Sequence, residues 1–232
     1  MAYKGIANPS LLDSFQIERL PVVAQMLVKT SNLYTHGVVA GTADDVEKST
    51  SGSGFLQWRD RALSMLDVNY RWSPAVFDER GTQGRDENDM KALAYQGYGP
   101  EDGVHAGDRA PDAPGLVAVS GEESSLFDIF KSYLHTVLIF PSGKEGVADV
   151  VEAARNCPPG TAQVIIIGST SIPSAVHGTT VYHDRQGTAW NAYHIAQGTF
   201  AVVVVRPDAY VGAFVYGSAG LQSYFAKIFK TT

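Results

Sequence analysis

The sequence predicts an α/β fold for its C-terminal half, preceded by a mainly helical N-terminal extension and a long linker. Two continuous apolar runs of strand length, at 136–140 and 162–168, flank an amphipathic stretch at 144–157. This pattern is typical of two buried parallel strands joined by a helix. The four valines of 202–205 are followed by a short polar break and a second apolar run, which predicts a hairpin.

The N-terminal extension opens with a helical pattern from Ser10 to about Thr30. Ser10 or Asn8 can cap its start, because both side chains accept hydrogen bonds from free backbone amides. Pro21 is expected to end or kink the helix, since proline lacks the amide proton that the helical ladder needs. The apolar residues that recur at helical spacing are Leu11, Phe15, Val22, Met26 and Leu27.

The middle of the chain supplies the best domain boundary. Residues 40–54 are polar and predict an exposed loop, whereas VNYRWSPAV at 68–76 predicts a strand. Residues 79–115 are rich in Gly, Asp and Pro and lose all periodicity, so they predict a linker that packs along a surface or is partly disordered. We therefore expect an extension at 1–78, this linker, and a C-terminal domain at 116–232.

The C-terminal domain reads as an alternation of helices and strands, with serines before its first helix and a Pro-Pro-Gly closing its second. The expected elements are a helix at 124–134, a strand at 136–140, a helix at 144–157, a strand at 162–168, a helix at 188–196, strands at 199–205 and 210–217, and a helix at 218–229. A crossover β-α-β unit followed by α-β-β-α is the thioredoxin topology.

A turn at 206–209 explains why the valine run stops. Pro207 fixes φ for the first turn position, and Asp208 favours a turn by bonding back to the chain. The turn accounts for these residues, so we expect neither Arg206 nor Asp208 to be catalytic.

The chemistry of a thioredoxin is missing. Its site needs two cysteines, two residues apart, where the first strand meets its helix. That junction reads FPSGKEG at 140–146, with Ser142 near the place of a thiol. The single cysteine, Cys157, falls at the far end of the helix and is expected to be a buried or half-buried structural thiol. The segment before the hairpin, AQGTF at 196–200, lacks the proline that thioredoxins carry there, so disulfide exchange is set aside.

Composition argues against several other classes. The formal net charge of −6 comes without clustered Lys or Arg, so no nucleic-acid surface is expected. The longest apolar run, Phe200 to Val205, is far too short for a membrane span. One cysteine fits the cytoplasm, and the N-terminus shows no secretory pattern. The histidines, which match no metal-ligand spacing, are His36, His105, His135, His177, His183 and His194.

No catalytic motif replaces the lost thiols. The sequence has no G-x-S-x-G elbow, Walker loop or H-E-x-x-H helix. Gly168-Ser169 follows a strand but lacks the further glycines of a phosphate loop, and SGSG at 51–54 precedes no strand-to-helix turn. The aromatic residues expected to pack in the core and the last helix, or to supply a dimer face, are Tyr193, Phe200, Phe214, Tyr216, Tyr224, Phe225 and Phe229.

Five segments of the chain carry motifs of one protein family, in that family's order. They are LLDSFQIERLPVVAQML at 11–27, VNYRWSPAV at 68–76, HAGDRAPDAPG at 105–115, LFDIF with HTVLIF within 126–140, and VVVVRPDAYVG at 202–212. Together they resemble the FAD-dependent aromatic-ring hydroxylases, in particular the phenol 2-monooxygenase-like group. The sequence departs from the motif at Ala209, where glycine is more usual.

The resemblance implies the C-terminal portion of such an enzyme, with a thioredoxin-like domain that has lost its thiols and serves packing and subunit association. The FAD-binding half, which carries the G-x-G-x-x-G fingerprint and most of the substrate pocket, is absent. Gly107-Asp108 belongs to the linker motif and is not the family's flavin-contacting Gly-Asp. We therefore expect no catalytic, cofactor-binding or metal residue in this chain.

Two functions remain open. The first is a non-catalytic thioredoxin-like module that is colourless and forms a homodimer or associates with a flavoprotein. Its extension, residues 1–75, is then expected to bear apolar surface that a second copy or partner must cover. The second is a fragment or component of an FAD- and NADPH-dependent monooxygenase that hydroxylates a phenolic substrate once the missing half is supplied. Disulfide exchange or glutathione binding rests on fold alone, and one remote cysteine argues against it. We favour the first for the isolated chain.

Overall fold

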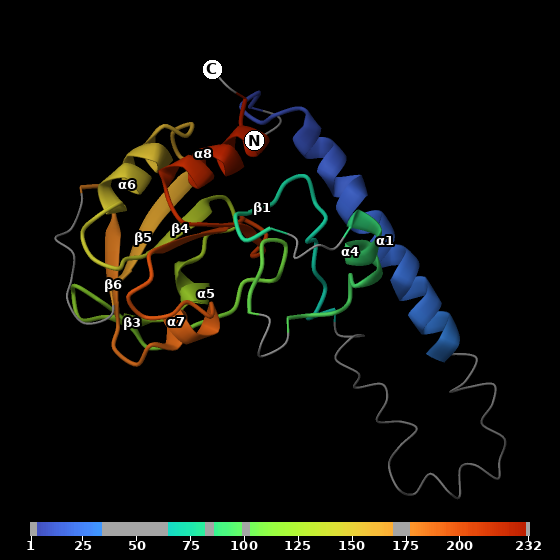
Figure 1. The fold of residues 1–232 in the computed structure, drawn as a ribbon, viewed down its shortest axis with the longest axis horizontal. Helices are drawn as coiled ribbons and strands as arrows, with labels where there is room; N and C mark the ends of the chain where they lie inside the picture. The colour runs from blue at the N-terminus through green and yellow to red at the C-terminus, as the bar shows by residue number, and fades with distance from the viewer. Residues whose placement is uncertain (1–3, 34–64, 82–85, 99–102, 169–176, 231–232) are drawn as a thin grey trace, which may run out of the picture.

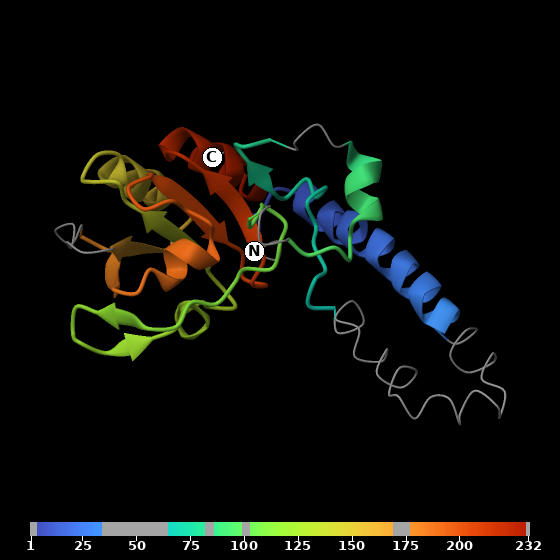
Figure 2. The ribbon, with the colours of Figure 1, turned by 60° about the horizontal axis from the view of Figure 1, so that its bottom comes forward.

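The computed structural model describes residues 4–33, 65–81, 86–98, 103–168 and 177–230, so the loop expected at 40–54 lies outside the described residues. Its centre is one mixed sheet with helices on both faces (Figures 1 and 2). The strands are β1 (Phe77–Asp78), β2 (Leu116–Ala118), β3 (Glu123–Ser124), β4 (His135–Phe140), β5 (Ala162–Gly168), β6 (Thr180–Asp184), β7 (Ala201–Val205) and β8 (Val211–Val215). The helices are α1 (Ser10–Leu33), α4 (Glu87–Ala92), α5 (Leu126–Ile129), α6 (Val147–Arg155), α7 (Thr188–Ala192) and α8 (Ser218–Ile228).

The order of the strands confirms the thioredoxin-like topology. The sheet runs β1-β8-β7-β4-β5-β6-β2-β3. Strand β4 pairs in parallel with β5 and antiparallel with β7, which pairs antiparallel with β8. Helix α6 joins β4 to β5, α7 precedes β7, and α8 follows β8. These are the β-α-β and α-β-β-α units expected from the sequence, and β5 lies between two parallel neighbours as expected.

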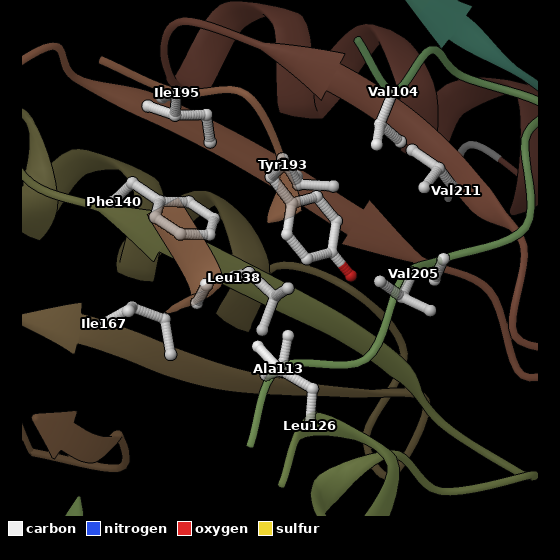
Figure 3. Packing of buried hydrophobic residues seen from close by; sticks show 14 of the residues in the cluster. Val104, Ala113, Leu126, Leu138, Phe140, Ile167, Tyr193, Ile195, Val205 and Val211 are labelled. Carbon is white, nitrogen blue, oxygen red and sulfur yellow. The ribbon is translucent and has the colours of Figure 1, made fainter. Parts of the chain in front are cut away.

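The side chains of the central strands alternate between two core layers, one on each face of the sheet. Val137 and Ile139 of β4 pack with α6 and α8. Leu138 and Phe140 pack on the other face with α5, α7 and the segment 103–116 (Figure 3). Both faces of β4 are therefore dry, which explains why its sequence is continuously apolar.

The stretch expected as a linker, 79–115, contributes to the second core layer. The Tyr193 hydroxyl, buried in that layer, donates to the carbonyl of Pro111 at 3.3 Å (Figure 3). The Thr188 hydroxyl donates to the carbonyl of Pro114 at 2.7 Å. The linker residues buried in this layer are Val104, Ala106, Ala110 and Ala113. The boundaries of the three parts stay a prediction.

Of the two outcomes expected at Pro21, an end of the helix is wrong, because α1 continues through this residue to Leu33, and the kink stays a prediction. Pro21 cannot donate a hydrogen bond to the carbonyl of Ile17, four residues earlier. The indole Nε1 of Trp72 donates to that carbonyl instead, at 2.9 Å. A side chain distant in sequence thus satisfies the carbonyl that proline leaves free, and the helix persists.

The expectation of a strand at 68–76 is also wrong. The amide of Ser73 donates to the carbonyl of Tyr70 at 2.9 Å, and this turn interrupts the extended backbone. The apolar side chains of the segment pack with Val22 of α1 and with Tyr210. Their alternation therefore reflects packing around a turn and not the pleat of a sheet.

Several C-terminal elements differ in length from the expectation. The helix expected at 124–134 is shorter and consists of α5 alone. It begins after Ser125, which forms a capping box with Asp128, and it ends where the backbone becomes extended at Phe130. Strands β1, β2, β3 and β6 and helix α4 were not expected. The strands are two to five residues long, too short for a period of two to be recognised.

The hairpin expected between β7 and β8 is confirmed. The amide of Ala209 donates to the carbonyl of Arg206 at 3.0 Å, and the amide of Arg206 donates to that of Tyr210 at 2.7 Å. Ala209 has φ of 64°, in the left-handed region. Three-residue hairpin loops favour glycine at this position, which explains why alanine is the less usual residue here.

Replacing this alanine, Ala209→Gly, is expected to raise the free energy of unfolding by about 0.5–1 kcal/mol, because glycine removes the left-handed strain. Urea unfolding measures the change. Ala219→Gly is the matched control: Ala219 is exposed within α8, so the same chemical change should lower stability by about 1 kcal/mol. Equal losses in both variants would contradict the strain at Ala209.

Candidate functional site

The place of a thioredoxin active site is a loop without a thiol. Ser142 lies exposed in this loop, between β4 and α6. Cys157 lies just beyond the other end of α6 and is half-buried. Burial raises the pKa of Cys157 to about 12, so the thiol stays protonated at neutral pH and is a poor nucleophile.

The linker motif at 105–110 is held by a buried ion pair. Arg71 donates from Nε and Nη2 to the two oxygens of Asp108, at 2.7 and 3.0 Å. The backbone amide of His105 donates to the same carboxylate at 2.8 Å. Burial raises the pKa of Asp108 and outweighs the opposing effect of Arg71. This carboxylate therefore fixes the segment around Arg71 and does not face solvent.

The same motif runs beside the start of β8. The amide of Gly107 donates to the carbonyl of Val211 at 2.7 Å, and the amide of Val211 donates to that of Asp108 at 2.8 Å. The amide of Ala110 donates to the carbonyl of Ala209 at 2.9 Å. The RAPD motif and the RPD hairpin, a hundred residues apart in sequence, thus form one backbone-paired unit.

A second Arg–Asp pair anchors the linker from the β1 side. Arg80 donates to both oxygens of Asp78, at 2.8 and 2.7 Å, and to the carbonyl of Val104 at 2.7 Å. Its guanidinium lies 3.7 Å from the centre of the Phe214 ring. Burial tends to raise the pKa of Asp78, but the hydrogen bonds from Arg80 and the Ala106 amide hold it below its ordinary value.

The third ion pair joins the hairpin to α1. Arg206 donates to the two carboxylate oxygens of Glu18 at 2.7 and 3.2 Å, and to those of Asp208 at 3.1 and 2.7 Å. The Ser73 hydroxyl donates to Glu18 at 2.6 Å. Burial alone would lower the pKa of Arg206, but the bonds and charges of the two carboxylates raise it.

Arg71, Arg80 and Arg206 of these segments are therefore paired with carboxylates. The three clusters connect α1, the 68–76 segment, the linker and the hairpin. The one hydroxyl beside a carboxylate in them, Ser73 on Glu18, is buried, and that carboxylate is held by Arg206, so the contact serves to join segments. Within the part of the chain that the structure describes, no three His, Cys, Asp or Glu residues gather as metal ligands. None of the helices described is both long and apolar enough to cross a bilayer.

His135 is a buried titratable group beneath α8. Its Nδ1 lies 3.3 Å from the Tyr224 hydroxyl, and the rings of Tyr224, Phe225 and Phe229 surround it edge-on. Burial, with a smaller effect from Arg206, lowers the pKa of His135 to about 4, and Asp208 opposes this weakly. The imidazole is therefore neutral in the folded protein at pH 7.

The free energy of unfolding is expected to fall as the pH is lowered, because of this histidine. Its pKa is about 4 when folded and about 6.5 when unfolded, so the unfolded chain binds more protons in between. The contribution of His135 is intact above about pH 6.5 and is lost progressively toward pH 4, by about 3 kcal/mol in total. Urea unfolding at the two ends of this window measures it.

The control for the pH effect is a non-titrating residue at the same place. His135→Gln should lose markedly less stability on acidification than the wild-type chain, whereas His177→Gln, at an exposed position, should behave like the wild type. The same acid loss in all three proteins would show that other groups cause it.

A groove of about 670 Å³ lies between α1, the 65–75 segment and the hairpin. Leu11, Phe15, Val68, Tyr70 and Tyr210 are among its apolar walls. The charged and titratable residues along it are Glu18, Arg19, Arg109, His135, Arg206 and Asp208.

Comparison with known proteins confirms the resemblance drawn from the motifs. Residues 170–232 match the family model described as phenol hydroxylase, C-terminal dimerisation domain. Pentachlorophenol 4-monooxygenase of Sphingobium chlorophenolicum is 30% identical over 152 residues, which cover 64% of this chain and 23% of that protein. A flavin-dependent monooxygenase of Mycobacteroides abscessus is 22% identical over 96% of this chain and 32% of its own length.

A solved structure agrees at the level of the fold. The flavin-dependent monooxygenase PieE, in complex with FAD and substrate, aligns with a TM-score of 0.60 and 20% identity, over 97% of this chain and 40% of PieE. The chain thus spans about a quarter to a third of the curated relatives it matches. It resembles the C-terminal part of flavin-dependent monooxygenases, including their dimerisation domain.

Sequence reasoning missed the ion pairs. Arg206 and Asp208 were assigned to the turn alone, and Glu18 was not singled out, although the three residues form one ion-paired cluster in which Glu18 and Arg206 are mostly buried. The one available signal was that an acidic residue lies within the first motif and an arginine within the last. Nothing in the sequence says that these two motifs meet.

Proposed function

We propose that this chain acts by association, as a non-catalytic thioredoxin-like module of the kind found at the C-terminus of flavin-dependent aromatic hydroxylases. The match of residues 170–232 to a dimerisation domain supports a homodimer. The single cysteine, with its raised pKa, supports a role without thiol chemistry and a place in the cytoplasm.

The observation that carries the proposal is an apolar stripe on α1. Leu12, Leu20, Val23 and Leu27 are spaced by eight, three and four residues, so they line one side of the helix. Their exposed fractions are 65%, 64%, 43% and 57%. Helix α1 lies at the edge of the molecule (Figures 1 and 2), and the exposed fractions show that the described residues leave this side of it uncovered. The apolar surface expected on the extension is therefore present.

The other side of α1, in contrast, is covered by the rest of the protein. Ser14, Glu18 and Val22, one turn apart, are buried against the rest of the protein. Leu11, Val22 and Met26 also pack against the core, so α1 is apolar on its packed side as well as along the stripe, and such a helix is normally enclosed on both sides. We infer that the stripe is covered by the FAD-binding half of a hydroxylase, because the relatives extend well beyond the part that this chain matches.

The stripe is tested with charged variants. Leu20→Glu with Leu27→Glu should reduce the fluorescence of an apolar surface dye by roughly half or more, while the oligomeric state, which we assign to the thioredoxin-like domain, stays unchanged. Gln186→Glu with Gln197→Glu adds the same charge at exposed positions outside α1 and should leave dye binding unchanged. Dye binding that survives the first pair would place the apolar surface elsewhere.

The alternative is a component of an FAD- and NADPH-dependent monooxygenase that hydroxylates a phenolic substrate. Similarity over nearly the whole chain to one part of such enzymes favours it. In this alternative the missing half supplies the reaction and not only a cover for the stripe: the isolated chain should stay colourless after incubation with FAD and desalting, and a yellow complex that hydroxylates a phenol should form only with a supplied FAD-binding half. Retained flavin absorbance in the isolated chain would contradict both proposals.

A further inference from the structure

The groove beside α1 has the size and lining of a small-molecule site. Its volume of about 670 Å³ is in the range of ligand pockets. Tyr70 and Tyr210 form one wall, with ring centres 4.7 Å apart, and Phe15 stands 68% exposed at the rim. Tyr70 and Tyr210 are 4% and 8% exposed, so they line the groove only with the parts of their rings that reach it, and together with the exposed Phe15 ring they offer apolar surface to an aromatic ligand.

The charge along the groove is unbalanced. Three arginines face two carboxylates, and His135 is neutral at pH 7. Both carboxylates, Glu18 and Asp208, are already bound by Arg206. Arg19 and Arg109 have no carboxylate partner among the described residues, so within this part of the chain the two positive charges at the rim are not matched by an anion.

These two guanidinium groups lie around the same aromatic wall. Arg109 lies over the Tyr210 ring at 5.5 Å from its centre, and Arg19 lies over the Phe15 ring at 5.9 Å. Burial raises the pKa of Tyr70, and the charge of Arg19 is close enough to oppose that rise. The positive charges therefore border the Tyr70–Tyr210 pair.

We propose that this groove binds an aromatic carboxylate, with its ring against Tyr70, Tyr210 and Phe15 and its carboxylate between Arg19 and Arg109. Guanidinium groups bind carboxylates in a bidentate manner, and aromatic rings stack on tyrosine. A cationic ligand would meet uncompensated like charge, and a neutral one would leave both arginines unpaired. Arg19 of the groove lies one turn from Val23 of the stripe, so the two surfaces adjoin on α1, but they have separate readouts: naphthoate affinity for the groove, and dye binding and oligomeric state for the association role.

The experiment uses naphthoate as the probe and naphthamide as its neutral counterpart, with calorimetry on the full chain at low salt. Naphthoate should bind with a dissociation constant on the order of 0.1–1 mM, and naphthamide about tenfold more weakly. Arg19→Gln and Arg109→Gln should each weaken naphthoate binding by about five- to tenfold. Arg185→Gln, a change at an exposed arginine outside the groove, should leave it unchanged.

Three results would overturn the proposal: no naphthoate binding, equal affinities for naphthoate and naphthamide, or an equal loss in the Arg185 variant. Thermal unfolding of each variant verifies that it is folded, and both rim arginines are exposed, so their loss should not affect folding. The oligomeric state, measured with and without naphthoate, should not change. A failure of the ligand site is thereby distinguishable from a failure of the association role.

Discussion

Gly107→Ala is expected to prevent stable folding, with a loss of more than about 3 kcal/mol. A Cβ at this position would lie 2.5 Å from the backbone nitrogen of Arg71 and 2.6 Å from the carbonyl carbon of Tyr70. Gly107 also has φ of 98°, which side chains rarely adopt. Its amide and carbonyl are both held by 2.7 Å hydrogen bonds to other segments, so the backbone cannot retreat. Soluble yield and urea unfolding measure the effect.

The control separates backbone strain from steric clash. Gly121 has φ of 90° but nothing within 4 Å of its Cβ position. Gly121→Ala should therefore cost only about 1–2 kcal/mol. If both variants lost the same amount, the close approach between the linker motif and the 68–76 segment would not be what demands glycine.

The second large effect is expected from Arg206→Met, which should lower the free energy of unfolding by about 3–5 kcal/mol. Glu18 is 6% exposed and would be left as a buried carboxylate, with the Ser73 hydroxyl as its one remaining side-chain hydrogen bond among the described residues. The methionine keeps the apolar stem but cannot donate. Urea unfolding at pH 7 measures the loss.

Removing the partner charge should restore most of that stability. The double variant Glu18→Gln with Arg206→Met buries no uncompensated charge and should recover at least about half of the loss. Arg155→Met, which breaks an exposed pair with Glu152, should cost about 1 kcal/mol or less. A double variant as unstable as Arg206→Met would show that the arginine acts through packing and not through its charge.

The elements that the sequence predicts well are those whose pattern is local. Strands β4, β5, β7 and β8 are continuously apolar because both faces of the sheet are covered. The amphipathic α6 and the hairpin turn at 206–209 likewise follow from nearby residues. The thioredoxin-like order could be inferred from these elements alone, and the sheet confirms it.

The errors occurred where distant residues decide. Helix α1 survives Pro21 because Trp72, 55 residues from Ile17, supplies the missing donor. The 68–76 segment alternates like a strand but turns at Ser73, where it binds Glu18 of α1. Single-sequence periodicity cannot register such contacts, since it describes only the neighbourhood of each residue.

The same limit applies to the candidate site. The motifs gave the resemblance to flavin-dependent hydroxylases, but the reason for their residues became clear only in three dimensions. Glu18 and Arg206 are 188 residues apart and form one ion pair. Arg71 and Asp108 are 37 apart and form another. These motifs hold the extension, the linker and the hairpin together. Their role in this chain is therefore structural.

The most direct test of the association role is light scattering of the purified chain after incubation with FAD and desalting, with absorbance recorded in the flavin bands. We expect a colourless protein with a mass of twice 24.9 kDa that persists on dilution. A yellow species would contradict a role without a cofactor. A monomer of 24.9 kDa over the whole concentration range would contradict association through the C-terminal domain.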